Sequence, residues 1–137
     1  MHMPELQVIR DTFTVTAAEA AAVNFWGRGI RPGEGVVTYI DTLAPERSKR
    51  ERWLVRSLVS VIVNSNGVRK HGAIVSVEGF NDRSSGTQLL ATSIQGFGEL
   101  TILQDFLVDY GLLIMLRPGA CIATDILSTV VSYEVVT

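Results

Sequence analysis

The chain has few of the residues that build metal and redox sites. Of its 137 residues one is a cysteine, Cys121, and two are histidines, His2 and His71. A single cysteine excludes an intramolecular disulfide bond and a cysteine-based zinc cluster. The metal-dependent double-stranded β-helix enzymes need two or three histidines and a carboxylate, which this chain does not supply. We therefore expect no metal and no cofactor.

Long apolar runs and strong net charge are also lacking. No stretch reaches the roughly 18 consecutive apolar residues of a membrane span, and residues 1–5 show no basic region leading into an apolar run. The formal net charge of −2 disfavours a nucleic-acid-binding surface based on bulk positive charge. We expect one soluble domain that is not exported by the usual route, with neither a membrane nor a nucleic acid as partner.

Helical periodicity is nearly absent, and period-two alternation dominates. The one helix-like window, residues 16–23, is long enough for one or two turns. Strands separated by Gly, Asn, Asp and Pro turns are predicted at residues 36–41, 53–63, 73–78, 88–95, 99–106, 110–117, 121–127 and 129–136. This pattern predicts an all-β fold, an antiparallel two-sheet sandwich of about eight strands.

The strand predicted at residues 53–63 has apolar residues on both faces. Strict alternation places Trp53, Val55, Ser57, Val59, Val61 and Val63 on one face and Leu54, Arg56, Leu58, Ser60 and Ile62 on the other. Such a strand is central in its sheet, or a neighbouring chain covers its second face.

The first 35 residues differ from the rest of the chain. Weak alternation at residues 6–16 is followed by an alanine-rich stretch and by a glycine-rich segment at residues 27–35. We predict an N-terminal arm and loop at residues 1–35 and a sandwich domain at residues 36–137. Phe25 and Trp26 are then either part of the core or anchors that insert into another subunit.

Charge is unevenly distributed along the chain. Residues 28–83 carry a net charge of +4 and residues 84–137 a net charge of −4. Arg47, Lys49, Arg50 and Arg52 crowd six positions, interrupted by Glu51. This basic segment is either a solvated loop or a contact with an acidic protein surface. As partner-binding residues we predict Phe25, Trp26, Arg47, Lys49, Arg50 and Arg52.

Catalytic patterns are weak. Cys121 lies between alanine and isoleucine, which indicates a small buried hydrophobic residue, and His71 is expected in an exposed turn. Asp105, Asp109 and Asp125 are the candidate carboxylates for acid–base work, but aspartate is common in turns. The glycine-rich segment lacks the Gly-Lys-Ser/Thr ending of a phosphate loop. We predict no catalytic residues and no enzymatic activity.

The order of short motifs from residue 36 onward resembles a known group of proteins. A strand at residues 36–40 leads to Thr42-Leu43-Ala44-Pro45, a basic loop, the strand beginning at Trp53 and an Asn/Gly/Arg turn. Near the end, residues 116–120 (Leu-Arg-Pro-Gly-Ala) precede Ser132-Tyr133-Glu134. This order is similar to the small jelly-roll β-sandwich structural proteins of tailed phages, most of all the trimeric capsid cement (decoration) proteins.

The resemblance covers residues 36–137 and transfers no individual functional residue. It implies a viral structural protein that is made in the host cytoplasm, binds the outer surface of the capsid in the virion and bridges capsomers. The implied partners are the major capsid protein and further copies of this chain in a homotrimer. A head-fibre, tail or host-recognition module is an alternative, and a cupin-like small-ligand binder is another. If the N-terminal arm is separate, deletion of residues 1–24 is expected to leave a folded sandwich.

Overall fold

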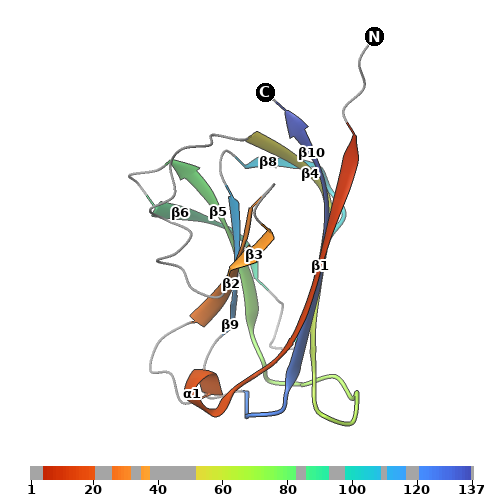
Figure 1. Cartoon of the computed structure of the whole chain (residues 1–137), viewed down its shortest axis with the longest axis vertical. Coiled ribbons are helices and arrows are strands. Elements are labelled where there is room, and N and C mark those ends of the chain that lie inside the picture. The colour runs from red at the N-terminus through yellow and green to blue at the C-terminus, as the bar shows by residue number, and fades with distance from the viewer. Residues whose placement is uncertain are drawn as a thin grey trace.

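The computed structural model describes residues 5–20, 26–31, 35–37, 52–82, 86–92, 98–108, 111–116 and 121–136. These residues form two antiparallel sheets, as Figure 1 shows. The first sheet contains β1 (Leu6–Thr14), β4 (Arg52–Val63), β7 (Glu99–Ile102), β8 (Phe106–Val108) and β10 (Ile126–Val136). The second contains β2 (Trp26–Arg31), β3 (Gly35–Val37), β5 (Val75–Asp82), β6 (Gly86–Thr92) and β9 (Gly111–Leu116). The all-β antiparallel prediction is confirmed.

Individual elements differ from the predicted ones. The strand expected at residues 99–106 is divided into β7 and β8, and the strand expected at residues 121–127 is largely a turn that precedes β10. The described part of the helical window forms one turn, α1 (Ala17–Ala20). Ten strands are therefore present in the described residues, where about eight were expected.

Residues 6–14 and 26–31 belong to the sheets, so these parts of the arm expected at residues 1–35 are not separate from the sandwich. β1 pairs with β10 over its whole length, from Leu6 opposite Glu134 to Thr14 opposite Ile126. β2 lies between β3 and β9 in the second sheet. The weak alternation at residues 6–16 is thus that of an edge strand, whose inner-face residues Ile9 and Asp11 are only partly buried.

The strands pair in a nested order along the chain. β1 pairs with β10, β2 with β9, β4 with both β7 and β8, and β5 with β6. The first strand therefore pairs with the last, and successive partners converge on the hairpin between β5 and β6. Further contacts of β10 with β4 and of β5 with β9 join these pairs into the two sheets.

The core lies between the two sheets. Trp53 and Tyr133, both buried, stack with their ring centroids 5.1 Å apart, and the Tyr133 hydroxyl donates a hydrogen bond to Gln7 Oε1 at 3.1 Å. The sheets approach closely at Gly79 of β5, where an added Cβ would lie 2.8 Å from a methyl carbon of Val108 on β8. A larger residue at position 79 would push the sheets apart.

A β-bulge in β4 changes which residues face the core. Ser57 lies opposite Ser132 of β10 but Val55 lies opposite Tyr133, so Arg56 is an additional residue. Before the bulge Trp53 and Val55 are buried, and after it the buried residues are Leu58, Ser60 and Ile62. The prediction that Val59, Val61 and Val63 share a face with Trp53 is therefore wrong, because one inserted residue reverses the alternation. Of the two alternatives for this strand, the central position in its sheet is observed, because β4 lies between β10 and β7.

Candidate functional site

The bulge brings together three charged side chains on the outer face of the first sheet. Arg56 forms an ion pair with Asp105, which lies in the break between β7 and β8. The Arg56 guanidinium also lies 3.3 Å from a carboxylate oxygen of Glu134 on β10. We call these three residues the Arg56 network. Because its members are far apart in sequence, only the pairing of the strands reveals it.

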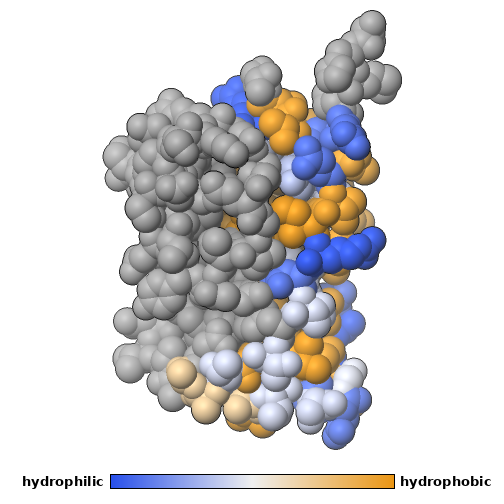
Figure 2. Space-filling model, in the orientation of Figure 1, coloured by the Kyte–Doolittle hydropathy of each residue, from blue (hydrophilic) through white to orange (hydrophobic). Residues whose placement is uncertain are grey.

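Large apolar side chains surround the Arg56 network. Leu54 lies next to Leu107 on one side and to Glu134 on the other, and Glu134 is opposite Leu6, so these residues form a row across the sheet. The most exposed members of the surroundings are Leu6 (53%), Val8 (46%), Leu103 (73%) and Leu107 (53%). We call these four residues the apolar patch. Figure 2 shows hydrophobic and hydrophilic surfaces side by side over the β1 side of the molecule.

An arginine amid exposed leucines resembles the make-up of protein interfaces. Arginine is enriched at interfaces because its planar guanidinium forms paired hydrogen bonds and is weakly hydrated. Its aliphatic stem and the leucines supply apolar area, while the carboxylates fix the orientation of the guanidinium. The arrangement has the chemistry of a docking surface.

The opposite end of the sandwich has a buried ion pair. Asp125 is fully buried, its Oδ2 accepts a hydrogen bond from the Ile122 backbone N–H at 2.9 Å, and Lys70 Nζ lies 3.3 Å from the same oxygen. The other carboxylate oxygen of Asp125 is buried without a hydrogen-bond partner among the described residues. Lys70 follows β4 and Asp125 precedes β10, so this pair connects two loops that close this end.

Cys121 lies beside this ion pair and is buried. Burial, with a further contribution from the negative charge of Asp125, raises the pKa of the Cys121 thiol to about 11. The thiol is therefore protonated at neutral pH, and a protonated thiol is a poor nucleophile. The expectation of a buried hydrophobic residue at this position is confirmed.

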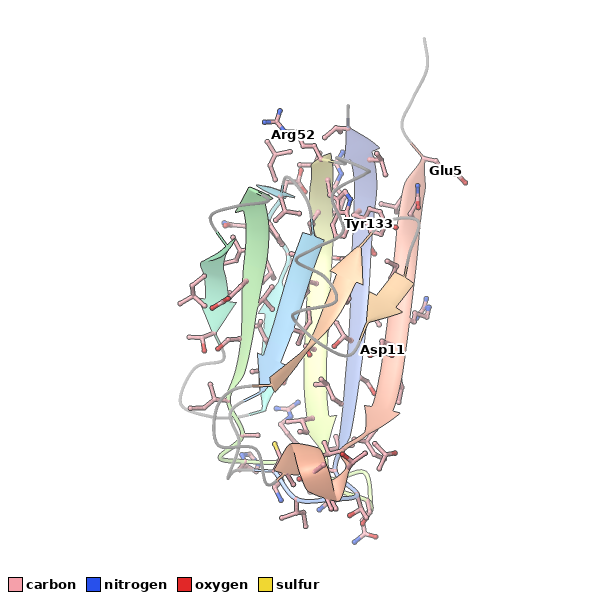
Figure 3. The ribbon with its side chains drawn as sticks, turned by 60° about the vertical axis from the view of Figure 1, so that its left-hand side comes forward. Glu5, Asp11, Arg52 and Tyr133 are labelled. Carbon is pink, nitrogen blue, oxygen red and sulfur yellow. The ribbon has the colours of Figure 1, made fainter. Side chains whose placement is uncertain are left out.

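The structure locates only some of the residues predicted from the sequence. Arg52 is exposed at the first position of β4, at the same end of the first sheet as Glu5, as Figure 3 shows. Trp26 begins β2, but its side chain is outside the description, as are Phe25, Arg47, Lys49 and Arg50. The predicted partner contact of these residues stays a prediction.

The candidate carboxylates do not converge in the described structure. Asp105 belongs to the exposed Arg56 network and Asp125 to the buried pair at the other end, while Asp109 is outside the description. His71 lies in an exposed turn, as expected. Within the described ranges, no three His, Cys, Asp or Glu side chains are grouped to hold a metal ion. The same part of the chain has no helix with the length and apolar character of a membrane span.

Comparison with known proteins gives no relative from which a role could be transferred. No protein-family model, no curated protein and no solved structure matches this chain.

Proposed function

We propose that the protein is a jelly-roll structural protein of a tailed phage that binds the outer shell of the capsid and connects its capsomers. The observation that carries the proposal is the nested strand order. With β7 and β8 counted as one interrupted strand and the short edge strand β3 set aside, eight strands form two sheets in the orders β1-β10-β4-β7 and β2-β9-β5-β6. A long hairpin rolled into two sheets, as in a jelly roll, gives such an order, and this agreement supports the proposal. Jelly rolls are common in viral capsid proteins.

The character of the interior supports a role in surface contacts over a role in ligand binding. The buried cluster contains residues of both sheets, among them Trp53 and Tyr133 from the first and Val77, Leu112 and Ile114 from the second. Cupin-like proteins bind their ligands between the sheets, in a space that here holds packed apolar side chains. Recognition is therefore assigned to the outside of the sandwich.

The proposed binding surface is the apolar patch around the Arg56 network, together with the basic segment that ends at Arg52. The partners are the major capsid protein and further copies of this chain in a homotrimer, placed at three-fold positions of the shell. Apolar anchors provide most of the binding energy in such contacts, and the arginines provide orientation and specificity.

The test is binding to capsids that lack this protein, prepared from the phage whose genome encodes it. Purified protein is mixed with the capsids, and the bound amount is measured by co-sedimentation and by cryo-electron microscopy. Saturable binding at regular positions of the shell is expected. Binding to tails or host cells instead would support the tail or host-recognition alternative, and binding to none of them would contradict the proposal.

A pair of matched variants tests the surface. Replacing both Leu103 and Leu107 with serine is expected to lower capsid affinity about tenfold. The control is Val68→Ser, since Val68 is similarly exposed at 58% but lies in the turn between β4 and β5. Equal affinity of all three proteins would place the contact on another surface.

A further inference from the structure

The edges of the two sheets differ in regularity. The edge of the first sheet opposite β1 is divided between β7 and β8 by residues 103–105. At the edges of the second sheet, the described part of β3 has three residues, and the pairing of β6 with β5 shifts register at two places. β1 has nine residues and pairs with β10 without any register shift. Short, bulged or interrupted edges discourage further strand pairing, and β1 has none of these features.

The edge of β1 that is turned away from β10 has the properties of a pairing surface. In the described part of the chain β10 alone pairs with β1, and Figure 1 shows β1 along one margin of the molecule. The strand contains neither proline nor lysine, and its charged residues are limited to Arg10 and Asp11 near its centre. Leu6 and Val8, on its outer face, are about half exposed. An antiparallel strand added here would make backbone hydrogen bonds and also cover apolar area.

We propose that two copies of the chain pair through β1 in antiparallel orientation, which extends the first sheet across a two-fold axis. In a continuous sheet, directly opposite residues lie on the same face. Five residues form the outer face of β1: Leu6, Val8, Arg10, Thr12 and Thr14. Their partners on the outer face of β10 are, in the same order, Glu134, Ser132, Val130, Ser128 and Ile126. Outer residues must therefore meet outer residues, and the axis passes through a residue near the strand centre.

Repulsion between like charges favours one of the registers whose two-fold axis passes near the centre of β1. An axis at Arg10 places the two arginines directly opposite each other, and an axis at Asp11 does the same with two aspartates. Like charges opposite each other destabilise a strand pair. An axis at Ile9 avoids both contacts: Arg10 lies opposite Val8 of the second copy, and Leu6 lies opposite Thr12. The strand is thus complementary to itself about Ile9.

This two-fold contact goes beyond the proposed capsid function and does not depend on it. It is also compatible with the proposed homotrimer, because two-fold and three-fold contacts combine in a closed hexamer. The two-fold dimer and the hexamer are both expected to have a mass in solution that is an even multiple of the 15.0 kDa of one chain.

The experiment uses opposite charges at one exposed position. Val8→Lys places a cation opposite Arg10 of the second copy at two equivalent sites, and it is expected to weaken the two-fold contact about tenfold. Val8→Glu places an anion there and is expected to strengthen it severalfold. Sedimentation equilibrium gives both constants. The two variants remove the same apolar surface, so their difference reports the charge opposite position 8.

A second replacement tests the partner of position 8. Arg10→Glu in the Val8→Lys background restores opposite charges and is expected to return the association constant to near that of the unmodified protein. Far-UV circular dichroism and thermal unfolding confirm that each variant is folded. A protein that shows no even-numbered species up to its solubility limit would overturn the proposal. Equal association of Val8→Lys and Val8→Glu would overturn it as well.

Discussion

The two ends of the first sheet each hold an ion pair, but the pairs are in different surroundings. At one end Arg56 and Asp105 have side chains that are 43% and 49% exposed. At the other end the Lys70 side chain is 24% exposed and Asp125 is fully buried. Water screens the first pair and stabilises each of its charges separately, so the pair adds little to folding. The second pair compensates a buried carboxylate, so loss of either partner leaves an uncompensated charge or donor.

The comparison separates a binding surface from a structural contact. Arg56 and Asp105 of the Arg56 network are accessible and have exposed leucines nearby, so these two charges are available to a partner. The Asp125 end is held by hydrogen bonds: the Val15 N–H donates to the Asp125 carbonyl at 2.7 Å, and the Thr124 N–H donates to the Val15 carbonyl at 3.0 Å. Thr124 has a φ of 85°, an uncommon conformation for a β-branched residue, and the surrounding contacts maintain it.

Deletion of residues 1–14 has the largest expected effect, because β1 connects the two ends. The strand begins beside Glu134 and leads to Val15 at the Asp125 end. We expect the truncated chain to be unfolded or aggregated, with loss of the β-sheet signal in far-UV circular dichroism. Deletion of residues 1–4 is the control and should leave the spectrum unchanged. A folded chain without β1 would restore the earlier expectation of a separate arm.

Asp125→Ala is expected to cause the second-largest loss of stability. It removes the acceptor of the Ile122 N–H and the partner of Lys70, and we expect the free energy of unfolding to fall by about 3 kcal/mol. Asp125→Asn keeps an acceptor for the Ile122 N–H and should lose clearly less. Urea unfolding monitored by tryptophan fluorescence measures both. Equal losses in the two variants would show that the backbone contact contributes nothing.

The Cys121 thiol predicts an alkaline loss of stability. Its pKa is raised from 9.0 to about 11 in the folded protein, so the folded state favours the protonated thiol. This contribution is fully present below pH 9 and is lost as the pH rises from 9 to 11. Allowing for solvent at this loop, we expect this loss to lower the free energy of unfolding by about 1 to 2 kcal/mol. Cys121→Ala should show a smaller change over this pH range, and an identical pH profile would contradict the assignment.

Disruption of the Arg56 network has the smallest expected effect on folding. For Arg56→Met and Asp105→Ala we expect urea midpoints close to that of the unmodified protein, with any difference decreasing at high salt because the groups are exposed. Capsid affinity, measured on the same proteins, should fall. A stability loss as large as that of Asp125→Ala would assign the network a structural role.

Sequence patterns were sufficient for the fold class and insufficient for the faces of β4. Alternation and turn residues predict local strands, and the strand at residues 53–63 is present with nearly the predicted bounds. The bulge at Arg56 is not visible in the alternation, because apolar residues occupy both faces of this strand. Its compensating irregularity, Leu103-Gln104-Asp105, interrupts the predicted strand at residues 99–106 and was the available signal.

Contacts between segments that are distant in the chain could not be predicted from one sequence. The weak pattern at residues 6–16 carries no information about its pairing with β10, and Asp125 gives no sign that it is buried beside Lys70. The loop before β10 was predicted as a strand because residues 121–127 are largely apolar. In the structure, the Asp125 side chain instead accepts the N–H of Ile122, and this local bond favours a turn.

The nested pairing has a consequence for synthesis on the ribosome. β1 leaves the ribosome before the other described strands and its partner β10 leaves after all of them, so β1 stays without that partner while the strands between them are made. The hairpin of β5 and β6 joins segments close in sequence and is available early. Loop closure makes distant pairs slower to form than local ones. During this interval the regular edge and apolar residues of β1 are open to chaperones and to other nascent chains.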